Sequence, residues 1–427
     1  MKTDILIIGS GCAGLYCALC LPQDKAITVI SKADLESSDS FLAQGGICVL
    51  RDEEDYDSFF EDTLKAGHYE NDRQSVDIMI RSSRRTIQDL IGYGVAFACD
   101  EGGGLCYTRE GAHSKPRILY HADITGREIT SKLLARVQER ANITLLPYTT
   151  CLDIIEEQGE CRGAVIACPD GSMETVSCAY TVLATGGVGG LYRHSTNFRH
   201  LTGDALAIAL RHGVALQDVD YVQIHPTTLY TKGESDRSFL ISESVRGEGA
   251  KLYNKNGERF VDELLPRDRL SEAIYRCMEQ DGTDFVWEDL RPIPEKQLRE
   301  HFPNIVTHCR EHGYDVTREC IPVVPAQHYF MGGVKVDCES RTSMPRLFAI
   351  GETACNGVHG KNRLASNSLL ESLVFAARAA AAMAAENGST AALPPVDLTP
   401  YRDQGALAVA YRDLVWNEIQ RRRIQNV

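Results

Sequence analysis

Asp4-Ile-Leu-Ile-Ile-Gly-Ser-Gly-Cys-Ala-Gly14 is the stretch that decides the fold of this chain. Its apolar run, Ile5 to Ile8, predicts a buried strand, and the residues after it predict a helix. Three glycines lie between strand and helix, at Gly9, Gly11 and Gly14. They suit a tight turn, a close backbone approach to a pyrophosphate and close packing of helix on strand. The phosphates would lie at the helix N-terminus, where free N–H groups and the helix dipole favour anions. The stretch therefore predicts dinucleotide binding, although glycine-rich loops also make plain turns.

The second strand indicates which dinucleotide binds. Ile27 to Ile30 predicts this strand of a βαβ unit. A nicotinamide-binding unit usually carries Asp or Glu near its end, where the carboxylate holds a ribose hydroxyl. Ser31 and Lys32 occupy that place here. The NAD interpretation is therefore weakened, and an FAD variant of the fold stays open.

The composition is typical of a globular protein with more than one domain. The chain has 427 residues, enough for two or three domains, with 43% hydrophobic and 24% charged residues. A net charge of −14 disfavours binding to nucleic acid and to anionic membrane surfaces. No run reaches the roughly 18 to 20 apolar residues that span a bilayer. Because the first strand begins near Asp4, we expect no signal peptide and a cytoplasmic location.

The 15 cysteines follow no regular framework, which favours reduced thiols over a disulfide scaffold. Cys12, Cys17 and Cys20 match the C-x4-C-x2-C start of a plant-type iron–sulfur site. These positions fall in the glycine loop and on the following helix, where small apolar residues pack. We therefore expect structural thiols and predict no metal site.

Alternating strand and helix patterns predict an α/β fold, with a Rossmann-like nucleotide-binding domain that a second domain interrupts. A buried strand, Tyr180 to Leu183, runs into a second glycine turn at Gly186 and Gly187. Near residue 219 the pattern changes to polar and charged groups in glycine- and proline-bounded turns. The predicted parts are 1–218 and 332–390 for the FAD-binding domain, 219–331 for an inserted α+β capping domain and 391–427 for a short helical C-terminal tail. Helices are expected over 56–66, 75–90, 125–140 (with a cap at Asp123 or Thr125), 203–216 and 405–423.

Three further segments carry groups that suit ligand binding. A small polar run ends in the pair Gly45 and Gly46, whose N–H groups can converge on a ligand. Residues 108–114 place Glu110 and His113 in a glycine-flanked loop, for which a solvated loop is the alternative. Residues 366–368 supply hydroxyls and N–H groups at the start of an alanine-rich helix, where an electron-rich flavin edge would be stabilised.

The order and spacing of these motifs resemble the succinate dehydrogenase/fumarate reductase flavoprotein family over roughly residues 1–385. The motifs are Gly9–Gly14, Ala43–Gly46, Ala184–Gly187, His225–Thr227, Arg246–Gly249, Pro266–Asp268, His328, Gly351–Glu352 and Arg363–Ser368. The resemblance implies a Rossmann-like FAD-binding domain, a capping domain and an oxidoreductase. It also leads us to expect a longer helical C-terminal region than this chain carries.

Two positions indicate the branch of the family. Members with covalent FAD attach it through a histidine, whereas Asp39, followed by Ser40, takes that place here, so FAD should be noncovalent. Glu110 stands where dicarboxylate oxidoreductases tend to carry an apolar side chain, and its charge would pair with a substrate ammonium. The chain thus resembles the branch that oxidises L-aspartate to iminoaspartate by hydride transfer to flavin N5. In that branch O2 or fumarate is the electron acceptor, and the reaction is the first step of de novo NAD biosynthesis by the quinolinate pathway.

The resemblance assigns roles to individual residues. The expected catalytic residues are Arg267, Glu110, His225, His328 and Arg363, and the expected substrate-binding residues are Gln223, Ser242 and Glu243. Arg363 would clamp a carboxylate, and Arg267 would handle a proton or act as an electrostatic clamp, since arginine is a poor base. The histidines taken alone would be satisfied turn residues. The expected FAD contacts are Gly9, Ser10, Gly11, Cys12, Ala13, Gly14, Lys32, Asp39, Ser40, Ala43, Gln44, Gly45, Gly46, Asp204, Glu352, Ser368 and Leu369.

Other functions stay open at this point. A soluble fumarate reductase or succinate dehydrogenase-type flavoprotein would share the same pocket. A flavin-binding scaffold without turnover has no need of converging cations, and an RNA-modifying flavoprotein is disfavoured by the acidic balance. The expected partners are L-aspartate with fumarate or O2, and the reactive imine makes handover to quinolinate synthase plausible.

Overall fold

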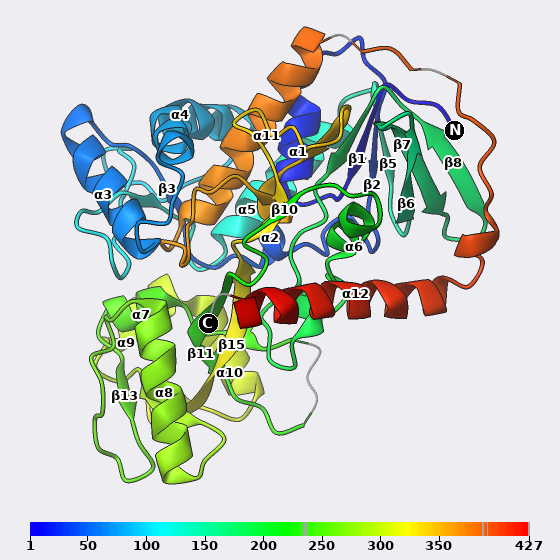
Figure 1. Ribbon diagram of the computed structural model, residues 1–427. Coiled ribbons are helices and arrows are strands. Elements are labelled where there is room, and N and C mark those ends of the chain that lie inside the picture. The colour runs from blue at the N-terminus through cyan, green and yellow to red at the C-terminus, as the bar shows by residue number, and fades with distance from the viewer. Residues whose placement is uncertain (234–236, 387, 391, 426–427) are drawn as a thin grey trace.

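The computed structural model describes residues 1–233, 237–386, 388–390 and 392–425 (Figure 1). Its centre is a five-stranded sheet in which every pairing is parallel. In sheet order its strands are β17 (Leu347–Ala349), β9 (Tyr180–Leu183), β1 (Ile5–Ile8), β2 (Ile27–Ile30) and β5 (Ile143–Leu146). All residues of β1, β2, β9 and β17 are buried, as expected for a parallel sheet covered on both faces. The predicted βαβ unit is confirmed.

Helices cover one face of this sheet (Figure 1). The alanine-rich helix α11 packs against α1, and α4 packs against α11. The bounds are α1 (Cys12–Cys20), α3 (Tyr56–Ala66), α4 (Arg73–Gly92), α5 (Thr125–Gln138) and α11 (Asn367–Glu386). α11 has 20 residues, and an 18-residue window within it has a mean hydropathy of 1.4, so its length and composition would allow it to cross a membrane. The expectation that no segment is long and apolar enough is therefore wrong. Because 67% of that window is buried inside the molecule, α11 is a core helix.

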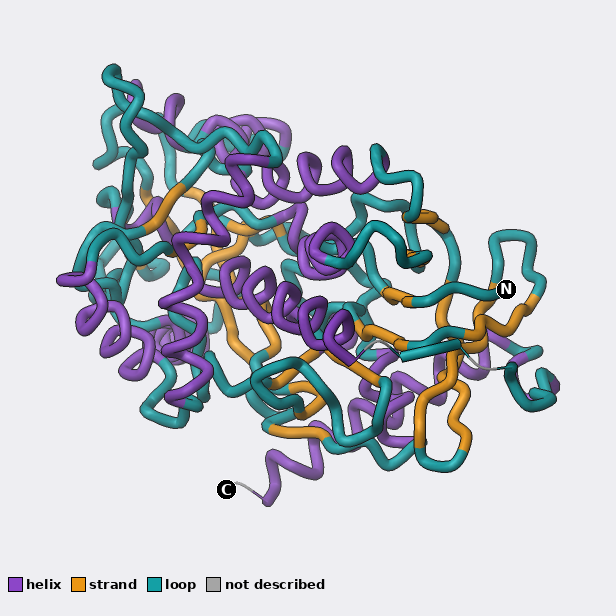
Figure 2. Tube along the Cα trace, turned by 90° about the horizontal axis from the view of Figure 1, so that it is seen from above, coloured by secondary structure: helices purple, strands orange, loops and turns teal. Residues whose placement is uncertain are grey.

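The opposite face is covered by a small antiparallel sheet and two helices. Residues from β1 and β9 share a core there with α6 and the tail helix α12. The bounds are β6 (Thr150–Glu157), β7 (Glu160–Ala167), β8 (Met173–Ser177), α6 (Asp204–Arg211) and α12 (Gln404–Gln425). β8 was not predicted. Residues 391 and 426–427 of the predicted tail lie outside the described residues. Seen in two directions, the last described turn of α12 lies well away from Met1 (Figures 1 and 2).

A second five-stranded sheet, entirely antiparallel, lies in the capping part (Figure 1). Its order is β12 (Phe239–Leu240), β11 (Val222–Leu229), β15 (Ile321–Phe330), β14 (Val286–Asp289) and β13 (Lys251–Tyr253). Around it lie α7 (Glu243–Gly247), α8 (Arg267–Asp281), α9 (Glu295–His301) and α10 (Pro303–Glu311). These elements share a core of their own. The register of β11 with β15 shifts on both sides of the pair Ile224 and His225. Such irregularities re-aim side chains.

Short elements complete the chain. The strands β10, β16 and β18 form a small sheet, in which β10 precedes β11 in the chain and β16 and β18 follow β15. The bounds are α2 (Asp39–Leu42), β3 (Ile47–Cys48), β4 (Ile118–Leu119), β10 (Leu216–Gln217), β16 (Gly333–Lys335) and β18 (Ala354–Cys355). Short 3-10 turns lie at Glu53–Asp55, Gly189–Leu191, Gly351–Thr353 and Thr399–Tyr401.

The predicted helix at 125–140 has its cap near Asp123 and Thr125, but the side chain of neither residue makes it. Neither candidate caps α5, whose N-cap residue is Ile124. The Asp123 carboxylate instead accepts hydrogen bonds from the N–H groups of Asn304 and Ile305, at 2.9 and 3.1 Å, at the start of α10. Asp123 therefore ties α10 of the capping part to the loop before α5. The first N–H groups of a helix have no partner inside that helix, and the fold brings those of α10 to the Asp123 carboxylate.

The structure describes every cysteine of the chain. All 15 are free, and Cys12 and Cys17 are buried while Cys20 is exposed. Among the described residues, no group of three or more His, Cys, Asp or Glu side chains is arranged to hold a metal ion.

Candidate active site

One cavity joins the carboxyl ends of the central strands to the capping sheet. Ile8, Ile30, Leu183 and Ile350 line it at the ends of β1, β2, β9 and β17, which is where α/β folds bind their ligands. Most of the predicted residues line the same cavity: Gly9, Ser10, Gly11, Ala13, Lys32, Asp39, Ser40, Ala43, Gln44, Gly45, Gly46, Glu110, Asp204, His225, Ser242, Glu243, Arg267, His328, Glu352, Arg363, Ser368 and Leu369. The nucleotide motifs and the charged residues of the second half thus meet in one place.

Three predicted residues do not belong to that lining. Cys12 is 1% exposed in the first turn of α1. A Cβ at Gly14 would meet the carbonyl oxygen of Gly9, so Gly14 serves the close packing of helix on strand. Gln223 lies behind two cavity arginines. The sequence placed all three at ligand contacts because spacing does not distinguish a side chain in the cavity from one directly behind it.

The first glycine turn is shaped for a phosphate. Gly9 has a φ of +124°, and a Cβ there would collide with the carbonyl oxygen of Ala184. Gly11 is the N-cap residue of α1 and offers no side-chain cap. The N–H of Cys12 donates to the Ser40 hydroxyl at 3.2 Å, and the other N–H groups at this end of α1 are left for an anion.

Polar atoms in the cavity fit a large polar ligand. Oδ2 of Asp39, Oε1 of Gln44 and Oγ of Ser38 are buried and have no hydrogen-bond partner in the described part of the chain, although all three residues line the cavity. Buried polar atoms normally have partners. Burial, together with the charge of Asp39, raises the pKa of Glu352 above its usual range, and its Oε1 accepts a hydrogen bond from the N–H of Phe330 at 2.9 Å. These atoms match the FAD site that the sequence predicts.

Lys32 and Asp204 form an ion pair at the nucleotide end of the cavity. Nζ of Lys32 lies 2.7 Å from Oδ2 of Asp204, and the Thr202 hydroxyl donates to Oδ1 at 2.7 Å. The N-cap of α6 is Gly203, with a φ of +77°, and no side chain caps this helix. The Asp204 carboxylate thus does not cap α6 and lines the cavity beside Lys32.

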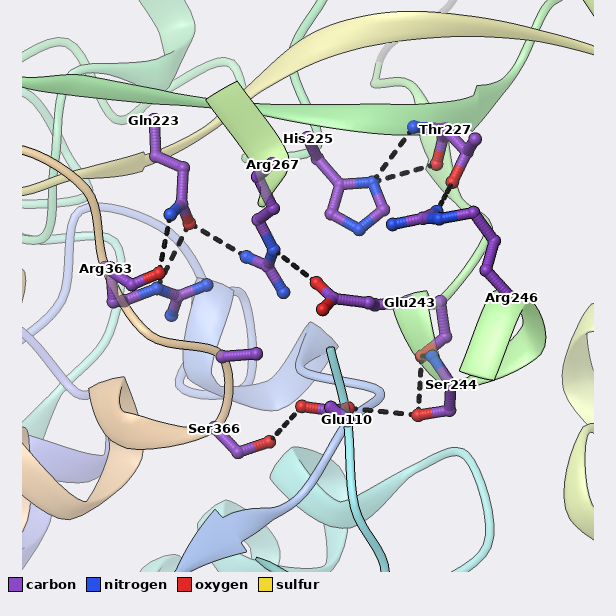
Figure 3. A network of polar contacts seen from close by, with 12 residues as sticks. Glu110, Gln223, His225, Thr227, Glu243, Ser244, Arg246, Arg267, Arg363 and Ser366 are labelled. Carbon is purple, nitrogen blue, oxygen red and sulfur yellow. Dashed lines mark hydrogen bonds and ion pairs between the residues drawn. The ribbon is translucent and has the colours of Figure 1, made fainter. Parts of the chain in front are cut away.

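Two arginines of the cavity are joined by the Gln223 amide, and one of them also pairs with a carboxylate (Figure 3). Arg267, in the first turn of α8, donates from Nε to Oε2 of Glu243 at 2.6 Å. Gln223 Oε1 accepts from Arg267 Nη1 at 2.8 Å and from Arg363 Nε at 3.3 Å. The Gln223 amide also donates to the carbonyl oxygen of Arg363 at 2.8 Å. Burial and the charge of Arg267 lower the pKa of Arg363. Since Glu243 compensates only one of the two guanidiniums, the cavity favours an anion.

Glu110 lies inside the cavity and is 5% exposed. Its Oε2 accepts a hydrogen bond from Ser366 at 2.7 Å, and its Oε1 accepts one from Ser244 at 3.0 Å (Figure 3). Burial and the nearby Glu243 raise its pKa, and these hydrogen bonds and Arg267 act against that rise. The solvated-loop alternative is wrong for this residue. At the start of α11, the Ser366 hydroxyl donates to Glu110 and the Asn367 side chain donates to Thr63 at 3.2 Å.

The two predicted histidines lie edge to face, with ring centroids 5.2 Å apart. Nδ1 of His225 contacts the backbone of Thr227, with its nitrogen at 3.2 Å and its oxygen at 3.0 Å, and Nδ1 of His328 contacts the Thr196 hydroxyl at 2.8 Å. Nε2 of His225 has no partner among the described residues. Burial and neighbouring arginines hold the pKa of both imidazoles well below 6.5. Both rings are therefore neutral hydrogen-bonding groups at neutral pH.

A buried arginine that the sequence analysis missed supports the Glu110 loop. Arg117 is fully buried and binds Asp55 through two hydrogen bonds of 2.9 and 3.1 Å and Asp62 through one of 2.6 Å. It also lies 3.0 Å from Nδ1 of His113, whose Nε2 is 3.0 Å from the carbonyl oxygen of Ala365. His113 is thus a structural link between the loop and the segment before α11. No local pattern marks Arg117, because its partners come from α3 and the turn before it.

Two other missed residues touch the predicted set. The guanidinium of Arg363 lies over the ring of Tyr329, 4.2 Å from its centroid, and Tyr329 lines the cavity. Ser244 on α7 holds Glu110, as described above. Tyr329 directly follows a predicted histidine, and Ser244 directly follows a predicted glutamate. Their position next to predicted site residues is the only feature of the sequence that points to them.

Comparison with known proteins places this geometry among flavoproteins. The profile of the FAD binding domain family matches residues 4–369. An L-aspartate oxidase of Clostridium perfringens is 50% identical over 377 residues, which are 88% of this chain and 85% of that protein. An L-aspartate oxidase of Clostridium acetobutylicum is 47% identical over 380 residues, 89% of this chain and 87% of that protein. Among solved structures, an E. coli quinol fumarate reductase matches with a TM-score of 0.84 and 31% identity, covering 96% of this chain and 74% of that one.

Proposed function

Since this chain belongs to the FAD binding domain family and, within it, to the L-aspartate oxidases, we propose that the arginine–carboxylate cluster is the site where it oxidises L-aspartate to iminoaspartate. The enzyme is FAD-dependent, and its reaction belongs to NAD biosynthesis. The observation that carries the assignment is that Glu110, Arg267 and Arg363 line one cavity. L-Aspartate has two carboxylates, which suit the two arginines, and one ammonium, which suits the glutamate.

FAD, when bound, supplies a two-electron oxidant whose N5 accepts hydride. The first glycine turn and the N-terminus of α1 would hold its pyrophosphate. Lys32, Asp204 and Glu352 would contact its sugar and ribityl parts, and the start of α11 would face the flavin ring. Asp39 offers no imidazole for a covalent bond to the cofactor, which supports noncovalent binding.

The chain's own residues then bind and orient the substrate. Arg363 and Arg267 would hold the carboxylates, since a planar guanidinium suits bidentate contact with them. Glu110 would pair with the ammonium. His225 and His328, both neutral, would donate or accept hydrogen bonds without adding charge. Together these contacts would align the Cα–H bond with the oxidant and exclude water from the cavity.

The ion pair with Glu243 supports a clamp role for Arg267. Arginine accepts no proton in proteins, and the Glu243 carboxylate at 2.6 Å holds this guanidinium in place as a donor. We propose that Arg267 binds and polarises a substrate carboxylate. The ammonium proton leaves by way of Glu110, whose pKa is raised by burial.

The broader arrangement extends this proposal. The division into parts 1–218, 219–331, 332–390 and 391–427 is supported by the two separate sheets and cores. We also propose a cytoplasmic location, O2 or fumarate as acceptor, and transfer of the imine to quinolinate synthase, because the imine hydrolyses in water.

One experiment separates this function from its nearest alternative. Anaerobic L-aspartate should bleach the flavin absorption of the purified holoenzyme, and succinate should not. Glu110→Gln should keep bound flavin but bleach with L-aspartate far more slowly. Bleaching by succinate alone would instead assign the protein to the soluble fumarate reductase or succinate dehydrogenase type.

A further inference from the structure

The Glu110 carboxylate is shared between the two halves of the site (Figure 3). One oxygen accepts a hydrogen bond from Ser366, which directly precedes α11 and contacts the central part. The other accepts one from Ser244, which lies on α7 of the capping part. Ser244 is itself fixed, because its N–H donates to the Ser242 hydroxyl at 3.3 Å and the two hydroxyls are 3.3 Å apart.

We propose that Ser244 is a positioning residue that makes the site selective for an amino dicarboxylate over a plain dicarboxylate, by holding the Glu110 carboxylate ionised and in one orientation. A hydroxyl that donates to a carboxylate stabilises its charged form, and two donors on opposite oxygens also restrict its rotation. Without the hydroxyl of Ser244, Glu110 keeps one donor and becomes free to turn about Ser366.

The surroundings make this hydrogen bond matter. Glu110 is buried, which disfavours its charge, and Glu243 disfavours it further. The charged and titratable groups that act on or respond to Glu110 are Glu243, Arg267, Arg246, Arg363 and Cys48. Arg267 is already neutralised by Glu243 at 2.6 Å. The hydroxyls that donate hydrogen bonds to Glu110 therefore provide much of the stabilisation of its charged form, and removal of one of them raises its pKa.

The consequence is specific to the substrate nitrogen. L-Aspartate offers an ammonium to the ionised carboxylate, whereas succinate has no such group. Loss of Ser244 should therefore weaken aspartate oxidation and leave succinate binding as it is. It should also move the acid limb of aspartate oxidation to higher pH, since Glu110 would need a higher pH to ionise.

Because this role presupposes the oxidation of L-aspartate proposed above, the test begins with the unmodified holoenzyme. In Ser244→Ala we expect kcat/KM for L-aspartate to fall about tenfold at neutral pH, with an unchanged inhibition constant for succinate and an acid limb at higher pH. The infrared band of the protonated Glu110 carboxyl, identified by its loss in Glu110→Gln, should persist to higher pH. Ser244→Thr keeps the hydroxyl and should restore the unmodified behaviour.

A matched control is Ser271→Ala, which removes a buried hydroxyl from α8 in the same capping part. It should change neither the ratio of aspartate activity to succinate binding nor the acid limb of the pH profile for aspartate oxidation. If the unmodified enzyme does not oxidise L-aspartate, the proposed function fails and the role of Ser244 with it. If it does, but Ser244→Ala leaves the aspartate-to-succinate ratio, the acid limb and the infrared band unchanged, the role of Ser244 alone is overturned.

Discussion

Arg267 donates a hydrogen bond from Nε to Oε2 of Glu243 over 2.6 Å, and the two side chains are only 9% and 10% exposed. Arg363 lies in the same cavity without a carboxylate at ion-pair distance among the described residues. The enzyme therefore carries one guanidinium with a carboxylate partner and one without, and a carboxylate of the substrate supplies the missing charge.

Removal of the Glu243 charge should destabilise the protein. In Glu243→Gln the amide keeps the shape but leaves Arg267 without its counter-ion, which costs about 3–5 kcal/mol when a buried pair is broken. We expect a lower melting temperature for the holoenzyme and a larger rise on addition of succinate than in the unmodified enzyme. Glu272→Gln, a change at an exposed side chain of α8, is the control. Equal melting temperatures would contradict the importance of this pair.

Arg363 should be required for turnover but not for the flavin. Loss of its guanidinium in Arg363→Leu removes a buried charge-assisted contact, so we expect kcat/KM for L-aspartate to fall about 100-fold or more. Arg363→Lys should recover little, because an ammonium does not make the bidentate contact. The flavin spectrum and the steady-state rate measure the two effects. Arg378→Leu, a change on α11 at an arginine that pairs with Glu339, should keep normal turnover. Normal oxidation by Arg363→Leu would show that the pocket is assigned wrongly.

Arg117 should matter for stability although it does not line the cavity. Arg117→Met leaves the carboxylates of Asp55 and Asp62 without their partner, which we expect to lower the free energy of unfolding by about 3–5 kcal/mol. The Glu110 loop should loosen as well, so KM for L-aspartate should rise. Urea unfolding measures the first effect. In the control, Arg299→Met breaks an exposed pair with Glu295 and should cost at most about 1 kcal/mol.

Glu288 should make the protein less stable as pH rises. It is fully buried, and burial raises its pKa from 4.5 to about 7, against the influence of Arg246. Between these two values the folded state holds a proton that the unfolded state has lost, so its stabilising contribution is present below about pH 4.5 and is lost as pH rises through about 7. In Glu288→Gln, the decrease in the free energy of unfolding over this pH range should therefore be smaller by up to about 3 kcal/mol.

Urea unfolding at pH 5 and pH 8 measures that difference. The same change at exposed Glu279 should leave the slope as it is. An unaltered slope in Glu288→Gln would mean that the Glu288 carboxyl is ionised in the folded protein throughout this range.

The flavin should leave the protein on denaturation. Asp39 lines the cavity and offers no imidazole for a covalent bond, so acid precipitation should release the yellow cofactor into the supernatant. Flavin fluorescence that migrates with the polypeptide in a denaturing gel would disprove noncovalent attachment.

Much of the fold follows from local pattern. β1, α1 and β2 were predicted because a short apolar run, a glycine turn and a helix leave few alternatives. β8 was missed because its residues Met173–Ser177 are only partly buried and carry little apolar signal. Asp123 was assigned to the wrong helix, since a capping residue binds whichever free N–H groups the tertiary structure brings near it.

The sequence by itself determined the phosphate-binding turn, the parallel sheet, the cofactor and the set of charged residues to expect. Each of these depends on residues close together in the chain or on motifs in a fixed order. Only the tertiary structure decided which groups touch: Glu110 meets Ser244 across 134 positions and Ser366 across 256. Hydrogen bonds and ion pairs of this kind act over a few ångströms in space, so their partners are set by how two sheets and their helices pack, and no spacing along the chain records them.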